Sequence, residues 1–140
     1  MSKKNTFHKC ERLCSLIAID RLFNGGSRSF SAFPIRIVYR LEEKAPEKPS
    51  EVQVLITVSK RHFHHAVDRN RVKRQIREAY RIEKDLLIQA VGPLQKSMLV
   101  SFIWQDDKLW DTNDVHQRVQ RLITRVVEKI SHGTNPETTE

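Results

Sequence analysis

The chain has 140 residues, of which 39% are hydrophobic and 30% are charged. Lysine and arginine number 25 against 17 aspartates and glutamates, which gives a formal net charge of +8 and a pI of about 9.8. This composition excludes a disordered chain and predicts one folded domain with its own core. The positive charge favours a polyanionic partner, most commonly nucleic acid, with an anionic membrane surface as the alternative.

Both ends of the chain are polar. We expect residues 1–10 to be flexible, residues 11–132 to form the domain, and residues 133–140 to be a disordered tail. The N-terminus lacks the apolar core of a signal peptide, and no apolar run is long enough to cross a membrane. We therefore expect a cytoplasmic protein without membrane contact. Cys10 and Cys14 lack a second pair of metal ligands nearby, so free thiols are predicted.

The N-terminal third is predicted to hold one helix and one short strand. Apolar periodicity predicts the helix over residues 11–24, and Gly25-Gly26 ends it. The short strand is predicted over residues 27–31, before Pro34, a residue that is confined to edges and turns of sheets.

Two stretches then alternate between apolar and polar residues, as half-buried strands do. The first covers residues 35–41 and the second covers residues 51–59. Between them, residues 42–50 are charged and contain two prolines, which is typical of an exposed loop. We predict that the two strands form an antiparallel hairpin.

A long helix is predicted next. Asp68 is a candidate N-cap, although a start one or two residues earlier also fits. The periodicity ends near Leu87 or Val91, before Gly92-Pro93. Leu86 falls with the apolar residues of this helix, and Lys84 falls with the basic ones.

The charge of the chain is concentrated around this helix. Residues 60–84 contain nine basic side chains and three acidic ones, so this segment carries +6 of the total of +8. The basic side chains form one arc of the helix, beside the apolar arc. Arginine dominates the basic arc, and its planar fork suits phosphate. The pattern predicts a surface for a polyanion.

The last two elements complete a single domain. A nearly continuous apolar run over residues 97–105 predicts a central strand. A final helix is predicted from a cap at Asp111 or Thr112 to Ile130. The predicted order is α-β-β-β-α-β-α, which favours an α/β (α+β) fold, a single two-layer sandwich.

The basic helix resembles the signature of a known family. Arg69-Asn70-Arg71 is followed by Val72-Lys73-Arg74 and by IREAYR at residues 76–81, as in the RNR motif of the bacterial ribonuclease P protein component. The resemblance covers about residues 11–131 and is strongest over residues 56–81. It implies a topology like that of a ribosomal protein, with a left-handed βαβ crossover through the basic helix.

The resemblance also implies a function. The chain would be the accessory protein subunit of the ribonucleoprotein endoribonuclease ribonuclease P, whose RNA subunit carries the active site. Its partners would be this catalytic RNA and precursor tRNA, whose 5′ leader is removed to mature the tRNA. No obligate protein partner is expected. Magnesium is expected at the RNA active site, with no cofactor bound by the protein.

The residues implied in RNA binding lie in the signature and in the turn before it. Arg71 lies off the centre of the basic arc and Arg69 lies near the helix start, so either one is also a candidate for local packing or for bonding to backbone carbonyls. Glu78 is spaced to pair with Arg74 or Arg81. The RNA-binding set is Lys60, Arg61, Arg69, Asn70, Arg71, Lys73, Arg74, Arg77 and Arg81.

A second set is implied to contact the leader of precursor tRNA. It comprises Ile19 and Phe23 from the first helix, with Ile37 and Tyr39 from the sheet. The family commonly has phenylalanine where this chain has Ile19, and an aliphatic side chain forfeits a base-stacking contribution of about 1–3 kcal/mol. Ile19 and Phe23 also fit positions in a core.

The sequence contains no catalytic constellation. His62, His64 and His65 lack further ligands for a metal site, so a solvated basic loop or an RNA contact is predicted instead. The loop is one residue longer than the family's usual link and lacks its glycine. The acidic residues are scattered, which does not predict the clustered carboxylates of a magnesium-dependent nuclease. No catalytic residue and no metal ligand is therefore assigned.

Two other functions would also account for a basic helix. A ribosome-associated RNA-binding module would carry the same charge, but the register of the RNR signature favours ribonuclease P. A DNA-binding regulator is disfavoured because the helix follows a strand and a loop, not the short helix and turn of a helix-turn-helix motif.

Overall fold

The computed structural model describes residues 27–94 without 44–51, and residues 96–131. Several predictions lie outside the described residues. These are the helix over residues 11–24 with Ile19 and Phe23, the two cysteines, most of the loop over residues 42–50, and the C-terminal tail. Within the described ranges the elements follow the predicted order.

Four strands form one sheet in the order β1-β2-β4-β3. They are β1 (Arg28–Ala32), β2 (Ile35–Glu43), β3 (Val52–Thr57) and β4 (Lys96–Trp104). β2 is antiparallel to both β1 and β4, whereas β3 is parallel to β4. The predicted hairpin between β2 and β3 is therefore wrong, because β4 lies between them. Alternation along a strand identifies its buried side but not its partner.

β4 occupies the interior of the sheet, as its apolar run predicts. One side of the strand carries Met98, Val100 and Phe102, all fully buried, and the other carries Leu99 and Ser101, also buried. A strand that is covered on both faces has no polar side to show in its sequence. The prediction of a central strand is confirmed.

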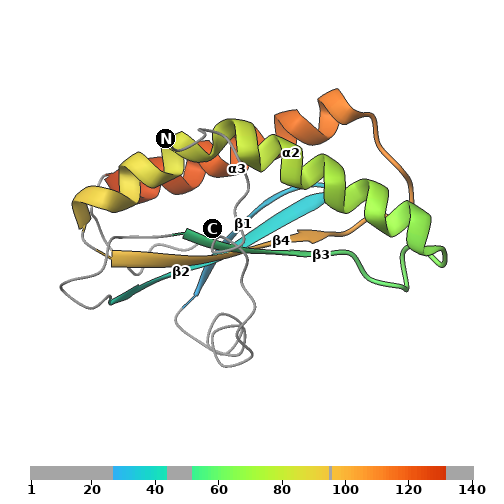
Figure 1. Cartoon of the computed structure of the whole chain (residues 1–140), viewed down its shortest axis with the longest axis horizontal. Helices are drawn as coiled ribbons and strands as arrows, with labels where there is room; N and C mark the ends of the chain where they lie inside the picture. Colours follow the sequence, from blue (N-terminus) through green and yellow to red (C-terminus); the bar gives the residue numbers. More distant parts are fainter. Residues whose placement is uncertain (1–26, 44–51, 95, 132–140) are drawn as a thin grey trace, which may run out of the picture.

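Two helices lie side by side on one face of this sheet (Figure 1). They are α2 (Ala66–Val91) and α3 (Thr112–Ser131), and a short 3-10 helix, η2 (Gly92–Leu94), follows α2 where the glycine and proline were predicted to end it. α2 joins the parallel strands β3 and β4, which makes the βαβ unit. Its left-handedness stays a prediction.

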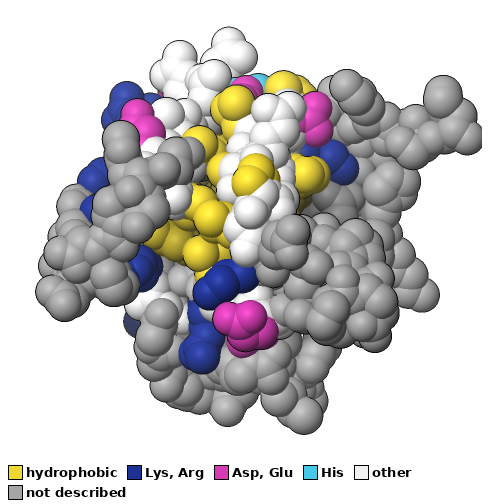
Figure 2. All heavy atoms as spheres, turned by 90° about the vertical axis from the view of Figure 1, so that its left-hand side faces the viewer, with side chains coloured by type: hydrophobic (Ala, Val, Ile, Leu, Met, Phe, Trp, Pro, Cys, Tyr) yellow, Lys and Arg dark blue, Asp and Glu magenta, His cyan; other side chains and the backbone are white. Residues whose placement is uncertain are grey.

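The main core lies between the two helices and the sheet. The sheet contributes large side chains such as Phe102 and Trp104, α2 contributes Tyr80, and α3 contributes Leu122. Figure 2 views the end of the molecule at which both helices stop, where hydrophobic side chains gather with lysine, arginine and acidic side chains beside them. Burial of the apolar side chains of the main core holds α2 to the sheet along its length.

The second half of α2 departs from the helical-wheel prediction. Lys84, assigned to the basic arc, is only 5% exposed, whereas Leu86, assigned to the core, is 46% exposed. Lys84 follows Tyr80 by four residues and precedes Leu87 by three, which places it on the buried stripe. A lysine tolerates this position because its methylene stem packs like an apolar side chain.

Candidate RNA-binding surface

The turn before α2 is ordered by bonds to one serine. The Ser59 carbonyl accepts hydrogen bonds from the amides of His62 (3.1 Å) and Phe63 (3.3 Å). The Ser59 hydroxyl accepts one from the Arg61 amide at 3.0 Å. This bonding closes the turn without a glycine. Lys60 and Arg61 stand at its corners and are exposed.

Helix α2 starts earlier than the predicted cap. Its N-cap is His65, whose side chain makes no capping bond, and the amides of Asp68 and Arg69 both bond the His65 carbonyl. Asp68 is therefore a residue of the first turn and not the N-cap. Its carboxylate there is favourable, because the N-terminal end of a helix carries partial positive charge.

The signature residues of α2 differ in their exposure. Asn70, Arg71 and Arg74 are exposed, and Lys73, Arg77 and Arg81 are half-buried. Arg81 pairs with Glu78, with Nε–Oε1 at 3.1 Å and Nη2–Oε1 at 3.0 Å. Of the two pairings that the sequence left open for Glu78, the structure selects Arg81. The exposed members form a cationic flank along the first half of the helix.

Arg69 faces the preceding turn. Its Nη1 donates hydrogen bonds to the carbonyls of Phe63 (2.9 Å) and His64 (3.1 Å). Of the roles left open by the sequence, bonding to backbone carbonyls is the one observed. Arg71, the other candidate for local bonding, is exposed.

Gln75 joins α2 to the start of α3. This buried side chain donates from Nε2 to the carbonyl of Trp110 and to Oγ1 of Thr112, both at 3.0 Å. One turn before it on the same side of α2 lies Arg71. Sequence reasoning missed Gln75, although a polar residue within the buried stripe of an amphipathic helix was the available signal.

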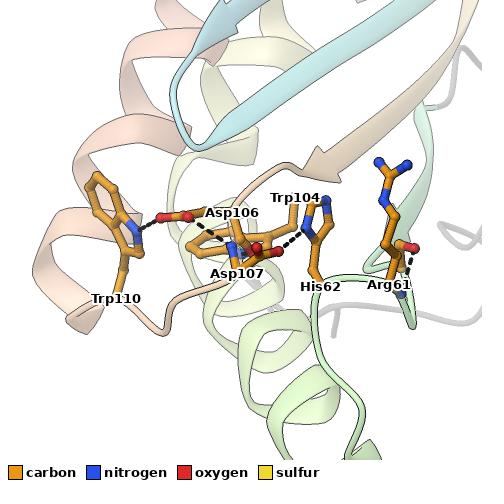
Figure 3. Close-up of polar contacts among 7 residues, drawn as sticks. Arg61, His62, Trp104, Asp106, Asp107 and Trp110 are labelled. Carbon is orange, nitrogen blue, oxygen red and sulfur yellow. Dashed lines mark hydrogen bonds and ion pairs between the residues drawn. The ribbon is translucent and has the colours of Figure 1, made fainter.

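A second set of contacts joins the basic turn to the connection between β4 and α3 (Figure 3). His62 Nδ1 and Asp107 Oδ1 are 2.6 Å apart. The neighbouring Asp106 accepts from Trp110 Nε1 at 2.8 Å and from the Asp107 amide at 2.7 Å. The hydrogen bond from Trp110 holds the pKa of the Asp106 carboxyl below its ordinary value. Arg61 points away from this contact.

The two described residues of the predicted leader-contact set lie inside the main core. Ile37 is 0% exposed and Tyr39 is 3% exposed, both on the side of β2 that faces the helices. Burial raises the pKa of the Tyr39 hydroxyl, and the nearby Arg28 opposes the shift. A buried side chain offers no face to a nucleotide, so the observation argues against direct leader contact by Ile37 and Tyr39. The other side of β2 carries Val38, which packs with Leu99.

Two further properties bear on function within the described ranges. No group of three or more histidine, cysteine, aspartate or glutamate side chains is placed to hold a metal ion. No helix there has the length and apolar character needed to span a membrane.

Comparison with known sequences shows the family to which the chain is similar. The family model described as ribonuclease P matches residues 7–128. The ribonuclease P protein component of Porphyromonas gingivalis is 36% identical over 118 residues, covering 84% of each chain. That of Chlorobaculum tepidum is 40% identical over 95 residues, covering 63% of this chain and 60% of the relative.

Solved structures give the same fold. The Staphylococcus aureus RNase P protein has a TM-score of 0.62 and 20% identity, covering 84% of this chain and 96% of that one. The Thermotoga maritima RNase P protein also has a TM-score of 0.62, with 19% identity over 82% of this chain and 96% of that one.

Proposed function

This chain belongs to the bacterial ribonuclease P protein family, and from that premise we propose that it binds the catalytic RNA of ribonuclease P through the basic turn and the cationic flank of α2. As a ribonuclease P protein component it is a subunit of an endoribonuclease of tRNA processing.

The observation that carries the proposal is the exposed cationic flank on a fixed support. Arg71 and Arg74 project from a helix whose opposite side is buried against the sheet and α3. Cations that neutralise RNA phosphates release condensed counterions, which favours association. Because the helix is held in place by its core contacts, little conformational freedom remains to be lost on binding.

The protein would serve as a helper of RNA catalysis. In this proposal the RNA subunit cleaves precursor tRNA with its own magnesium ions, and the protein adds affinity for the substrate and its 5′ leader. Ile19 and Phe23 remain the proposed leader contacts. Ile37 and Tyr39 would act only indirectly, by supporting the sheet from within the core.

Reconstitution tests this function. Cleavage of precursor tRNA by ribonuclease P RNA is measured at low magnesium, with and without the protein. We expect the protein to stimulate cleavage. The matched control is a protein with Arg71→Ala and Arg74→Ala, which should stimulate much less while remaining folded. Absence of stimulation by the unaltered protein at every protein-to-RNA ratio would contradict the proposal.

A further inference from the structure

The first arginine of the RNR signature is committed to the protein backbone. Both acceptors of Arg69 Nη1, the carbonyls of Phe63 and His64, belong to the segment that leads into α2. The side chain is half-buried, in contrast to the exposed Asn70 and Arg71 that follow it. The three residues of the signature therefore do not present themselves to RNA in the same way.

Electrostatics alone would disfavour an arginine at this place. Arg69 lies in the first turn of α2, where the partial positive charge of the helix end repels a cation. Two carbonyl oxygens offset this repulsion, since a guanidinium forms strong hydrogen bonds with them. The helix start also lacks a side-chain cap from His65, so the bonds of Arg69 are an alternative link between the helix and the preceding chain.

The segment that Arg69 holds is the one that carries Lys60 and Arg61. Phe63 anchors it in the main core, and Ser59 closes its turn with three hydrogen bonds. His62 ties it to Asp107 on the opposite side (Figure 3). With the carbonyls of residues 63 and 64 fixed by Arg69, the turn is held from the core, from α2 and from the connection between β4 and α3.

We propose that Arg69 is a positioning residue, which fixes the basic turn so that Lys60 and Arg61 meet RNA, while Asn70 and Arg71 are left to contact RNA themselves. This inference rests on the proposed function, because it assigns roles within the same surface. A turn that is ordered before binding loses less conformational entropy when it meets RNA. The contribution of Arg69 to affinity is thus made through Lys60 and Arg61.

A double-mutant cycle tests this dependence. The dissociation constant for ribonuclease P RNA is measured for Arg69→Ala, for the pair Lys60→Ala and Arg61→Ala, and for all three changes together. We expect Arg69→Ala to weaken binding about threefold or more in the unaltered protein, and less than about twofold when the two turn cations are already absent. Equal loss in both backgrounds would mean that Arg69 contacts RNA on its own, and would overturn the proposal.

A second cycle is the matched control. Arg77 lies two turns further along α2, is half-buried as Arg69 is, and has no hydrogen bond or ion pair to the basic turn among the described contacts. Arg69→Ala and Arg77→Ala should therefore add, within about twofold. Coupling as strong as that with Lys60 and Arg61 would indicate a general loss of structure and would also contradict the proposed role.

Hydrogen exchange of the free protein separates this inference from the proposed function. Amides of residues 60–65 should exchange faster in Arg69→Ala than in the unaltered protein, and no faster in Arg77→Ala. Unchanged exchange in Arg69→Ala would overturn the proposal whatever the RNA does. Faster exchange in Arg69→Ala together with no binding of ribonuclease P RNA by the unaltered protein would overturn the proposed function and, with it, the role of Arg69 in RNA binding. The structural role of Arg69 in fixing the turn would still be supported. Arg69→Lys, which keeps the charge, replaces Arg69→Ala if the latter does not fold, with the same expectations.

Discussion

The two helices that lie on the sheet are both basic at their surface, yet they use their arginines differently. On α3, Arg118 stands over the Trp110 ring at 5.1 Å and donates from Nε to the Phe33 carbonyl at 3.0 Å, and Arg125 stands over the Phe30 ring at 4.6 Å. On α2, Arg71 and Arg74 are exposed and form no ion pair with the described residues. Charge alone therefore does not identify an RNA-binding helix. The informative property is the grouping of exposed guanidiniums: Arg71 and Arg74 lie one turn apart on α2, whereas Arg121 is the one exposed arginine of α3.

The largest effect is expected on the α2 side of this comparison. Replacing Arg71 and Arg74 together with alanine should weaken binding to ribonuclease P RNA by roughly tenfold or more, because two phosphate contacts are lost. The plot of log affinity against log salt should become shallower by about 1.4–1.8, which is the change expected for two contacts. Filter binding over a series of salt concentrations measures both quantities. An unaltered slope would show that these side chains do not meet phosphate.

Gln75 tests the link between the two helices. Gln75→Ala removes two hydrogen bonds in a buried place and should lower the free energy of unfolding by about 1–3 kcal/mol. Gln75→Glu is the same size but places a buried carboxylate oxygen against the Trp110 carbonyl, which can only accept, so it should be more destabilising at neutral pH and recover in acid. Denaturant titrations of both variants at two pH values provide the measurement. Equal stability of Gln75→Ala and the unaltered protein would mean that these hydrogen bonds do not contribute to the free energy of unfolding.

Arg118 tests the α3 side. Arg118→Ala should lower the melting temperature by a few degrees, roughly the effect of 1 kcal/mol, because it loses a cation–π contact and a hydrogen bond. Its RNA affinity and salt slope should stay as they are. Arg121, exposed on the same helix, is the matched control, and Arg121→Ala should change neither property. A shallower salt slope for Arg118→Ala would break the comparison between the helices.

The smallest effect concerns the connection between β4 and α3. The pKa of Asp106 is lowered in the folded protein, so its carboxylate stabilises the fold at pH values above the pKa of an unfolded aspartate. This contribution is lost as the pH falls through the folded pKa. Asp106→Asn should therefore melt slightly lower than the unaltered protein at pH 7, and the difference should shrink in acid. Thermal melts at pH 7 and pH 3 measure this difference in melting temperature. A difference that is larger at pH 3 than at pH 7 would contradict the prediction.

The sequence predicts the individual helices and strands better than it predicts which strands pair. α2, α3 and β4 follow from apolar spacing. A helix buried on one side repeats its apolar residues with the helical period, and a strand buried on both sides shows a nearly continuous apolar run. β2 has buried residues on both sides, with Ile37 and Tyr39 in the helix-facing core and Val38 beside Leu99 on the other side, where Arg36 is exposed. Alternation places Ile37 and Tyr39 on the apolar side of β2, which agrees with their burial, and their assignment as leader contacts came from the resemblance alone. The pairing of β3 with β4 joins segments separated by the whole of α2, and no local pattern encodes it.

The candidate site was predicted residue by residue, but not with its division of roles. The signature locates the cationic flank, and the exposed positions of Arg71 and Arg74 fit it. The Arg69 side chain bonds two carbonyls because of the backbone path before α2, and the spacing of charges does not predict that path. The contact of His62 with Asp107 crosses 45 positions of sequence and gave no signal.

The place of β4 has a consequence for how the protein is made. β4 begins at Lys96, after the basic helix, yet β2 and β3 both need it as their neighbour in the sheet. β1 and β2 are adjacent in sequence and can pair as soon as they emerge from the ribosome, whereas β3 and α2 must wait for a later segment. A nascent chain that ends before residue 96 would therefore carry the charges of the RNA-binding surface without the strand that completes the sheet beneath them.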